Sequence, residues 1–110
     1  MNWNILLFES SRGEKPVEDF IKKQQPQAKA KISQKIKLLK QYGNLLGMPH
    51  AKTLESGLYE LRIRGKEEIR IFYCFRGNII NILHAFKKQT QKTPQKELST
   101  AFLRMKTIKS

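Results

Sequence analysis

The chain has 110 residues, of which 22 are Lys or Arg and nine are Asp or Glu, so its formal net charge is +13. This length predicts one domain, residues 1–110, with a single core, and a hydrophobic fraction of 39% excludes a wholly disordered chain. The excess of positive charge predicts a polyanionic partner, with nucleic acid before an acidic protein or an anionic membrane surface.

Two features of the sequence predict a cytoplasmic protein. Cys74 is the single cysteine and cannot form an internal disulfide, which favours a reducing compartment. Residues 1–8 contain one short apolar run without preceding positive charges, and no apolar stretch is long enough to cross a bilayer. We therefore expect neither a signal peptide nor a membrane role.

The first half of the chain predicts a strand followed by two helices. Asn2–Glu9 carries a nearly continuous apolar run, typical of a strand covered on both faces. A helix is expected to begin near Pro16, and Pro26 ends it and opens a second helix over Gln27–Tyr42. Gly43 is suited to end that helix. The apolar side chains of the second helix recur at helical spacing: Ala28, Ile32, Ile36 and Leu39.

The second half of the chain predicts an antiparallel meander. Three runs rich in Ile, Tyr and Phe are separated by two short turns that contain glycine, which is the signal of three consecutive antiparallel strands. Residues 44–56, before these runs, are expected to be irregular. The three predicted strands are Leu58–Arg64, Glu68–Arg76 and Asn78–Phe86.

A last helix completes the predicted fold. Thr93 and Pro94 form a suitable N-cap and first helical residue, and the helix is expected to run to about Lys106. The order β-α-α-β-β-β-α describes an α+β domain. We expect its antiparallel meander to pack against the N-terminal helical hairpin, with the helices on one side of the sheet.

Strand alternation places arginines on one face of the meander. Arg62 lies in the middle of its strand and shares a face with Glu60 and Arg64. Pairing across the turn at residues 65–67 brings Arg70 close to Arg62. Two like charges at that separation repel each other unless an anion or Glu60 compensates them. The pair therefore indicates either a phosphate site or a surface pair neutralised by Glu60.

Four further basic residues are candidates for contacts with a polyanion. Lys87 and Lys88 follow the last strand of the meander, where a lysine pair also serves as solvated protection of a sheet edge. Lys52 and His50 lie in the irregular segment before the meander. Their location is the reason to consider them.

Two side chains in the predicted strands, those of His84 and Tyr73, are candidates for proton transfer in a catalysed reaction. A single histidine within an apolar strand is also typical of a hydrogen-bonded core residue, and Tyr73 shares the inward pattern of Ile71 and Phe75. Both side chains therefore have a structural alternative.

Four segments together resemble the RelE/ParE toxin superfamily, and within it the HigB-like, phage-derived branch. The resemblance covers nearly the whole chain, and the order and spacing of the segments carry it. The segments are SRGEKPVEDFI at 11–21, GLYELRIR at 57–64, EEIRIFYCF at 67–75 and ILHAFKKQTQKTP at 82–94.

The resemblance implies the toxin of a type II toxin–antitoxin pair. Such a toxin enters the A site of the ribosome and cuts the translated mRNA. The implied partner is a small helix-turn-helix antitoxin, HigA-like, which binds the toxin directly and represses the shared operon, so that operator DNA is reached through the complex. The RelE-like fold of the superfamily matches the predicted order of elements.

The chemistry implied is metal-free and needs no cofactor. The 2′-OH of the RNA attacks the adjacent phosphate, and the enzyme aligns the attack, moves two protons and stabilises the transition-state charge. Guanidinium groups suit the last role because their planar fork pairs with two phosphate oxygens. The expected catalytic residues are Arg62, Arg70, Lys87, His84 and Tyr73. The expected RNA-binding residues are Lys52, Lys88, Arg64 and His50.

Two other functions fit the same sequence. One is a ParE-like inhibitor that binds DNA gyrase and needs no catalytic cations. The other is a basic nucleic-acid-binding module without catalysis. The lysines of the second helix fit phosphate contacts to ribosomal RNA or a merely soluble basic face: Lys29, Lys31, Lys35, Lys37 and Lys40.

Overall fold

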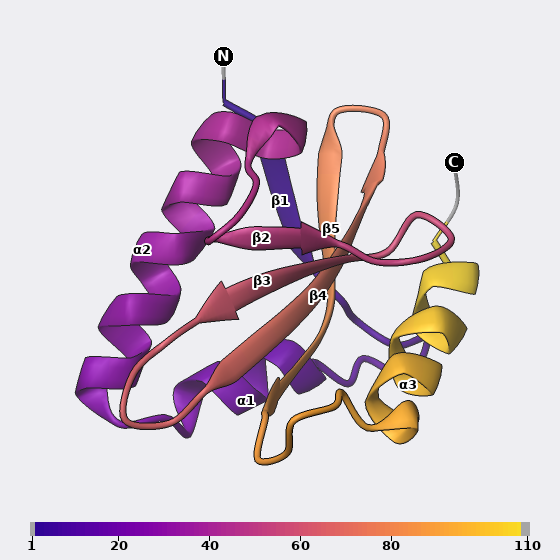
Figure 1. Ribbon diagram of the computed structural model, residues 1–110. Helices are drawn as coiled ribbons and strands as arrows, with labels where there is room; N and C mark the ends of the chain where they lie inside the picture. The colour runs from indigo at the N-terminus through magenta and orange to yellow at the C-terminus, as the bar shows by residue number, and fades with distance from the viewer. Residues whose placement is uncertain (1, 109–110) are drawn as a thin grey trace.

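The computed structural model describes residues 2–108, which form an α+β fold with a five-stranded mixed sheet and three helices (Figure 1). A short 3₁₀ turn, η1 (Gly43–Leu45), follows the second helix. The helices are α1 (Pro16–Lys22), α2 (Pro26–Tyr42) and α3 (Gln95–Lys106). The strands are β1 (Asn4–Leu7), β2 (Ala51–Thr53), β3 (Tyr59–Ile63), β4 (Ile69–Arg76) and β5 (Ile79–Lys87).

The sheet has the strand order β1-β5-β4-β3-β2. Its centre is the antiparallel meander β3-β4-β5, as predicted. The segment 44–56, expected to be irregular, contributes the short strand β2, which pairs antiparallel with β3. The irregular prediction is therefore wrong at these three residues, because backbone pairing with β3 makes a strand of a short segment that lacks an apolar run and follows Gly47 and Pro49.

The first strand, β1, pairs parallel with the last strand, β5, so that Asn4 lies opposite Ile79. This places β1 at an edge of the sheet, and Leu6 is 55% exposed while Ile5 and Leu7 pack against the core. The expectation of a strand covered on both faces is wrong. An apolar run of this length cannot distinguish a central strand from an edge strand with one solvated side chain.

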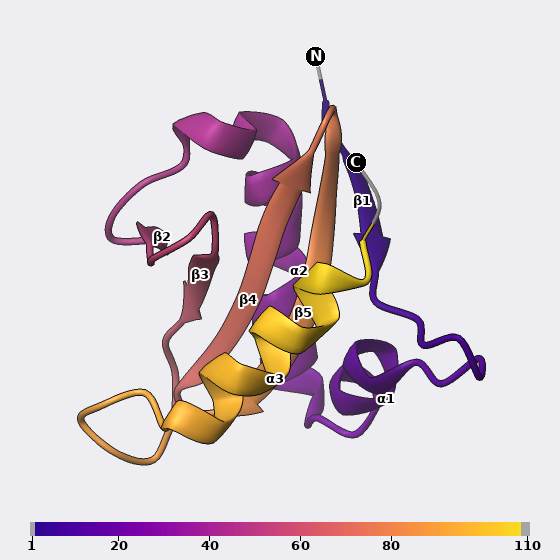
Figure 2. The same cartoon turned by 90° about the vertical axis from the view of Figure 1, so that its right-hand side faces the viewer.

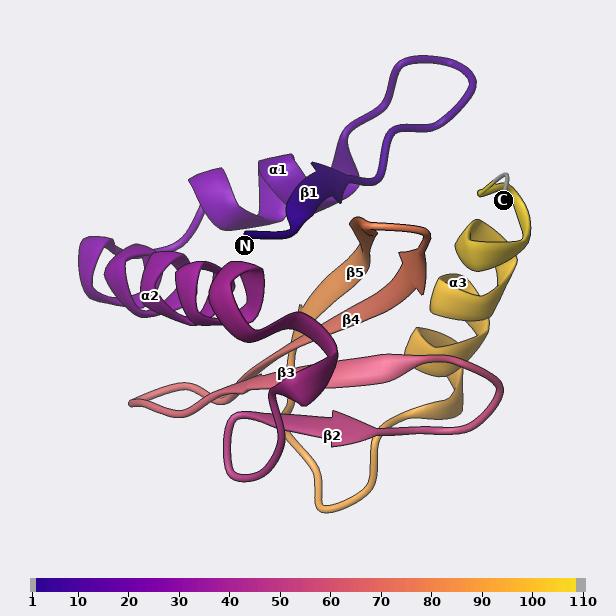
Figure 3. The ribbon, with the colours of Figure 1, turned by 90° about the horizontal axis from the view of Figure 1, so that it is seen from above.

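Helices cover both faces of the sheet, which corrects the expectation that they lie on one side (Figures 2 and 3). On one face, α1 and α2 bury Val17, Ile32 and Leu39 against the inward residues of the strands. On the other, α3 buries Ala101 and Met105. The physical reason is that alternation gives the central strands a second apolar surface, which α3 removes from water. That surface consists of Phe72, Cys74, Leu83 and Phe86.

The helix ends follow the predicted punctuation with two shifts, of which the first is that α1 ends at Lys22, before Pro26. Pro26 opens α2, and Gly43 follows it with a positive φ of 54°. A side chain at Gly43 would clash with the ring of Trp3, so glycine is needed there for space as well as for conformation. Pro94 is the N-cap of α3, one residue later than predicted from Thr93. Among the described residues, no helix has the length and apolar character to cross a membrane.

Candidate functional site

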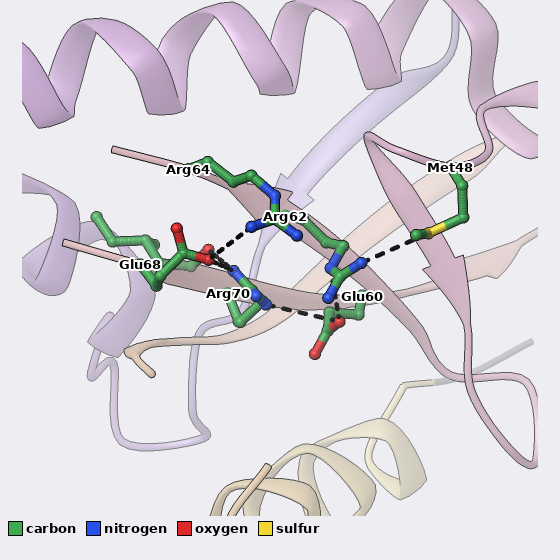
Figure 4. A network of polar contacts seen from close by, with 7 residues as sticks. Met48, Glu60, Arg62, Arg64, Glu68 and Arg70 are labelled. Atoms are coloured by element: carbon green, nitrogen blue, oxygen red, sulfur yellow. Dashed lines mark hydrogen bonds and ion pairs between the residues drawn. The ribbon is translucent and has the colours of Figure 1, made fainter. Parts of the chain in front are cut away.

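Arg62 and Arg70 face each other directly across β3 and β4, which confirms their predicted proximity (Figure 4). The carboxylate of Glu60 lies between them: its Oε1 is 3.6 Å from Arg62 Nε and 3.7 Å from Arg70 Nε. The side chains of Glu60 and Arg70 are 4% and 3% exposed, whereas that of Arg62 is 16% exposed. Glu60 therefore compensates the pair, and Arg62 is the member that reaches solvent.

A second carboxylate, Glu68, extends this arrangement. Its Oε1 is 3.0 Å from Arg70 NH1 and 3.7 Å from Arg64 NH1. The sequence expectations do not include Glu68, although strand alternation places it on the same face as Arg70. The five side chains form one line of alternating charge, which we call the arginine cluster: Arg62, Glu60, Arg70, Glu68 and Arg64.

The arginine cluster has buried donors without acceptors. The Nε atoms of Arg62 and Arg70 are both buried and make no hydrogen bond, because the Glu60 oxygen is beyond hydrogen-bond distance from each. Leaving a buried donor unpaired is costly. With three arginines and two glutamates the cluster carries one net positive charge. Its open side, at Arg62 and the exposed Arg64, is therefore suited to an anionic ligand.

The loop before β2 borders the arginine cluster. Arg62 NH1 lies 3.7 Å from Met48 Sδ, and the Arg62 backbone N–H donates to the His50 carbonyl at 2.8 Å. His50 is half-buried, and its ring Nδ1 accepts from Lys35 Nζ at 2.7 Å. His50 thus lies beside the cluster, with one ring nitrogen engaged in holding the loop to α2.

Lys52 lies on the same sheet face as the arginine cluster. It is exposed on β2 and stands opposite Glu60 in the β2–β3 register, and paired residues share a face. The structure therefore brings Lys52 to the border of the site.

The two lysines after β5 lie on different faces. Lys87 stands opposite Ile69, on the α2 side, and its Nζ is 3.0 Å from Glu67 Oε2. Lys88 donates its backbone N–H to the Glu68 carbonyl and so continues the register on the face of the arginine cluster. The structure therefore brings Lys88, and not Lys87, to the arginines.

A β-bulge in β5 decides which lysine faces the site. The register passes from Phe72 opposite His84 to Tyr73 opposite Ile82, which leaves Leu83 without a partner. Counting by alternation from the β4–β5 turn would place Lys87 on the cluster face. The extra residue shifts the count by one and places Lys88 there instead.

His84 belongs to a closed network beneath α3. Its Nε2 is 2.7 Å from Glu97 Oε1, and Arg104 NH1 donates to its Nδ1 at 3.2 Å and to the Leu83 carbonyl at 2.9 Å. Because a guanidinium is always a donor, the ring is neutral with its proton on Nε2. Burial lowers the pKa of His84, a shift that the hydrogen bond to Glu97 partly opposes. Neither ring nitrogen is free for proton transfer.

Tyr73 lies away from the arginine cluster. It is 1% exposed within the core beneath α1 and α2, on the opposite face of the sheet, and its ring stacks on Tyr59 at 5.5 Å. Burial raises the pKa of its hydroxyl. The structure does not bring Tyr73 together with the arginines.

The lysines of α2 form a separate basic surface. Lys35 is half-buried against His50, and the others are exposed along the helix. The exposed members are Lys29, Lys31, Lys37 and Lys40.

One protein-family model matches most of the chain. It describes phage-derived proteins similar to Gp49 and covers residues 19–106, a range that contains the whole arginine cluster. No curated protein matches the chain at a significant level.

Proposed function

The chain belongs to the Gp49-like family of phage-derived proteins, and from that premise we propose that it is a HigB-like toxin that cuts mRNA on the ribosome. The Gp49-like family is a RelE-like toxin family associated with toxin–antitoxin systems. Cleavage of mRNA, dependence on the ribosome and the HigB-like branch are our proposals.

The observation that carries the proposal is the arginine cluster. Its rim arginine, Arg62, has a buried Nε without an acceptor, and the chain as a whole is strongly basic. An RNA phosphate that meets the solvent-facing NH groups of Arg62 neutralises the excess charge. The guanidinium fork of Arg62 then pairs with the non-bridging oxygens, and the net charge of the cluster attracts the polyanion.

The reaction that suits this site is transfer of the phosphate to the neighbouring 2′-OH. The 2′-oxygen forms a bond to phosphorus and loses its proton, the bond to the 5′-oxygen breaks, and that oxygen gains a proton. The products are a 2′,3′-cyclic phosphate and a 5′-hydroxyl. Arg62 stabilises the additional negative charge as phosphorus becomes five-coordinate. Arg70, which is buried between Glu60 and Glu68, positions the cluster and does not contact the substrate.

Three further cations extend the site along the RNA strand, of which Arg64 and Lys52 are exposed and Lys88 is half-buried. Arg64, Lys88 and Lys52 lie on the same sheet face as Arg62. They bind phosphates on either side of the scissile bond, which gives affinity that falls with salt. In this proposal Lys87 contributes to stability or general charge, since its side chain lies on the other face.

The proposed partners follow from the toxin family and from the charge. A HigA-like helix-turn-helix antitoxin binds the toxin directly, covers the cationic face with an acidic segment, and brings the complex to operator DNA. The proposed site of action is the cytoplasm, where ribosomes and mRNA are present.

The test is cleavage of a defined mRNA by purified ribosomes in the presence of the protein. We expect cuts within the reading frame, and Arg62→Ala to reduce the rate at least about 100-fold, the scale of losing one transition-state donor. Lys87→Ala is the matched control, because it removes one positive charge from the other face. Intact mRNA with a folded wild-type protein would overturn the proposal. Inhibition of DNA gyrase in the same preparation would then identify a ParE-like inhibitor.

A further inference from the structure

The loop between η1 and β2 presents an exposed methionine beside the rim of the arginine cluster. Met48 is 61% exposed, although methionine is usually buried. Its Sδ lies 3.7 Å from NH1 of Arg62, the cluster arginine with a partly exposed guanidinium between Met48 and Glu60 (Figure 4). Three residues earlier, Leu45 is 82% exposed. One large exposed apolar side chain, that of Met48, thus lies against the candidate phosphate site.

The position of Met48 is fixed by the backbone around it. The His50 N–H donates to the Gly47 carbonyl at 3.0 Å, and the Ala51 N–H donates to the same carbonyl at 3.1 Å. The Arg62 N–H donates to the His50 carbonyl at 2.8 Å, and Lys35 holds the His50 ring. The loop is therefore tied to β3, to α2 and to itself, so Met48 keeps its place relative to Arg62.

A nucleotide whose phosphate is held by Arg62 carries its base within reach of Met48. The thioether is polarisable and flexible, and it makes favourable contacts with aromatic rings. Every base presents such a ring, and the two fused rings of a purine present more of it than a pyrimidine does. An apolar side chain that is exposed in the free protein also gains most when a flat ligand covers it.

We infer that Met48 contacts the base next to the phosphate held by Arg62 and gives the enzyme a preference for a purine at that position. This inference rests on the proposed function and adds a residue that determines specificity. A base fits better than an apolar protein segment, because the methionine is in contact with a cation and the surrounding rim is positively charged.

The test uses ribosomes programmed with A-site codons that differ by a purine or a pyrimidine at one position. Met48→Ala should lower kcat/KM for the preferred purine codon about 2- to 10-fold, the range of a lost sulfur–ring contact. It should leave kcat/KM for the pyrimidine codon almost unchanged, so that the ratio of kcat/KM between the two codons falls. Met48→Leu should keep most of the preference for the purine codon. Leu103→Ala, at a similarly exposed apolar residue of α3, is the matched control.

The outcomes separate the two proposals. If wild type and Leu103→Ala cleave and Met48→Ala shows the wild-type codon profile, the base contact is wrong and the proposed function stands. If that variant instead loses affinity for the antitoxin, Met48 belongs to the protein interface and the base contact is again overturned. If the wild type cleaves no codon, both proposals fall. A thermal midpoint equal to that of the wild type shows that the variant is folded.

Discussion

Two polar networks lie on the same face of the sheet and differ in how well their atoms are paired. In the histidine network, formed by His84, Glu97 and Arg104, both ring nitrogens have partners within 3.2 Å. In the arginine cluster, two buried Nε atoms have none. The first network lies beneath α3, the helix that crosses β4 and β5 in Figure 2. The second lies on β3 and the first part of β4.

The difference shows that residue type alone is a weak guide to a functional site. A histidine is the most usual choice for proton transfer, yet His84 is engaged in holding α3 to the sheet. The arginines could have been a neutral surface pair, yet their pairing with Glu60 is incomplete. Buried donors without acceptors, in a cluster that one partly exposed arginine opens to solvent, are better evidence for a ligand than the presence of a suitable side chain.

The largest effect should come from Glu60→Ala. Removing this carboxylate leaves Arg62 and Arg70 facing each other without compensation, and breaking a buried ion pair costs about 3–5 kcal/mol. Chemical denaturation should show this loss in the free energy of unfolding. Added phosphate should restore part of it in the variant and much less in the wild type. A variant as stable as the wild type would mean that Glu60 does not hold the cluster together.

His84→Ala should destabilise the protein by about 2 kcal/mol, because Glu97 and Arg104 each lose a half-buried hydrogen-bond partner. The rate of mRNA cleavage per folded molecule should remain at the wild-type level. Thr100→Ala is the control on the same helix, since this exposed hydroxyl bonds only to a backbone carbonyl of α3. A lost cleavage rate with unchanged stability would place His84 in the chemistry instead.

The same histidine should make stability depend on pH. Its folded-state pKa is lowered by burial, so the unfolded chain takes up the proton first as the pH falls. The free energy of unfolding should therefore decrease as the pH falls below about 6.5, by at most about 1.4 kcal/mol per pH unit. His84→Gln should remove this part of the slope between pH 7 and pH 5. Equal slopes in the two proteins would contradict the closed network.

The smallest effect separates the two lysines after β5. Lys88→Ala should weaken RNA binding a few-fold and reduce the number of phosphate contacts, read from the salt dependence, by about one. Lys87→Ala should change neither, because its ammonium group pairs with Glu67 on the other face. Measuring both variants by fluorescence anisotropy at several salt concentrations gives the comparison. Weaker RNA binding by Lys87→Ala, with no change in Lys88→Ala, would mean that the bulge does not decide which lysine lies on the face of the arginine cluster.

Local sequence signals were sufficient for the meander and for the pairing of Arg62 with Arg70. A short turn fixes the register of the strands on either side, and alternation then fixes the faces. The same reasoning does not tell on which face Lys87 and Lys88 lie, because the unpaired Leu83 leaves no distinct mark in an apolar run.

Long-range features could not be predicted from local patterns. The apolar residues of α3 indicate that it packs, but not on which face, since both faces of β4 are apolar. The incomplete pairing of Arg62 and Arg70 depends on distances of a few tenths of an ångström. The contact of Met48 depends on a loop held by backbone hydrogen bonds to β3. None of these three features follows a repeating pattern of residues that can be read from the sequence.

The parallel pairing of β1 with β5 has a kinetic consequence. Asn4 must find Ile79, so the first strand of the sheet has no partner until the last one has been synthesised. The β3–β4 and β4–β5 hairpins close short loops and form early, whereas a parallel pair between distant segments pays a larger loop-closure cost. Folding on the ribosome should therefore begin at the central hairpins. The strand made first is the last to enter the sheet.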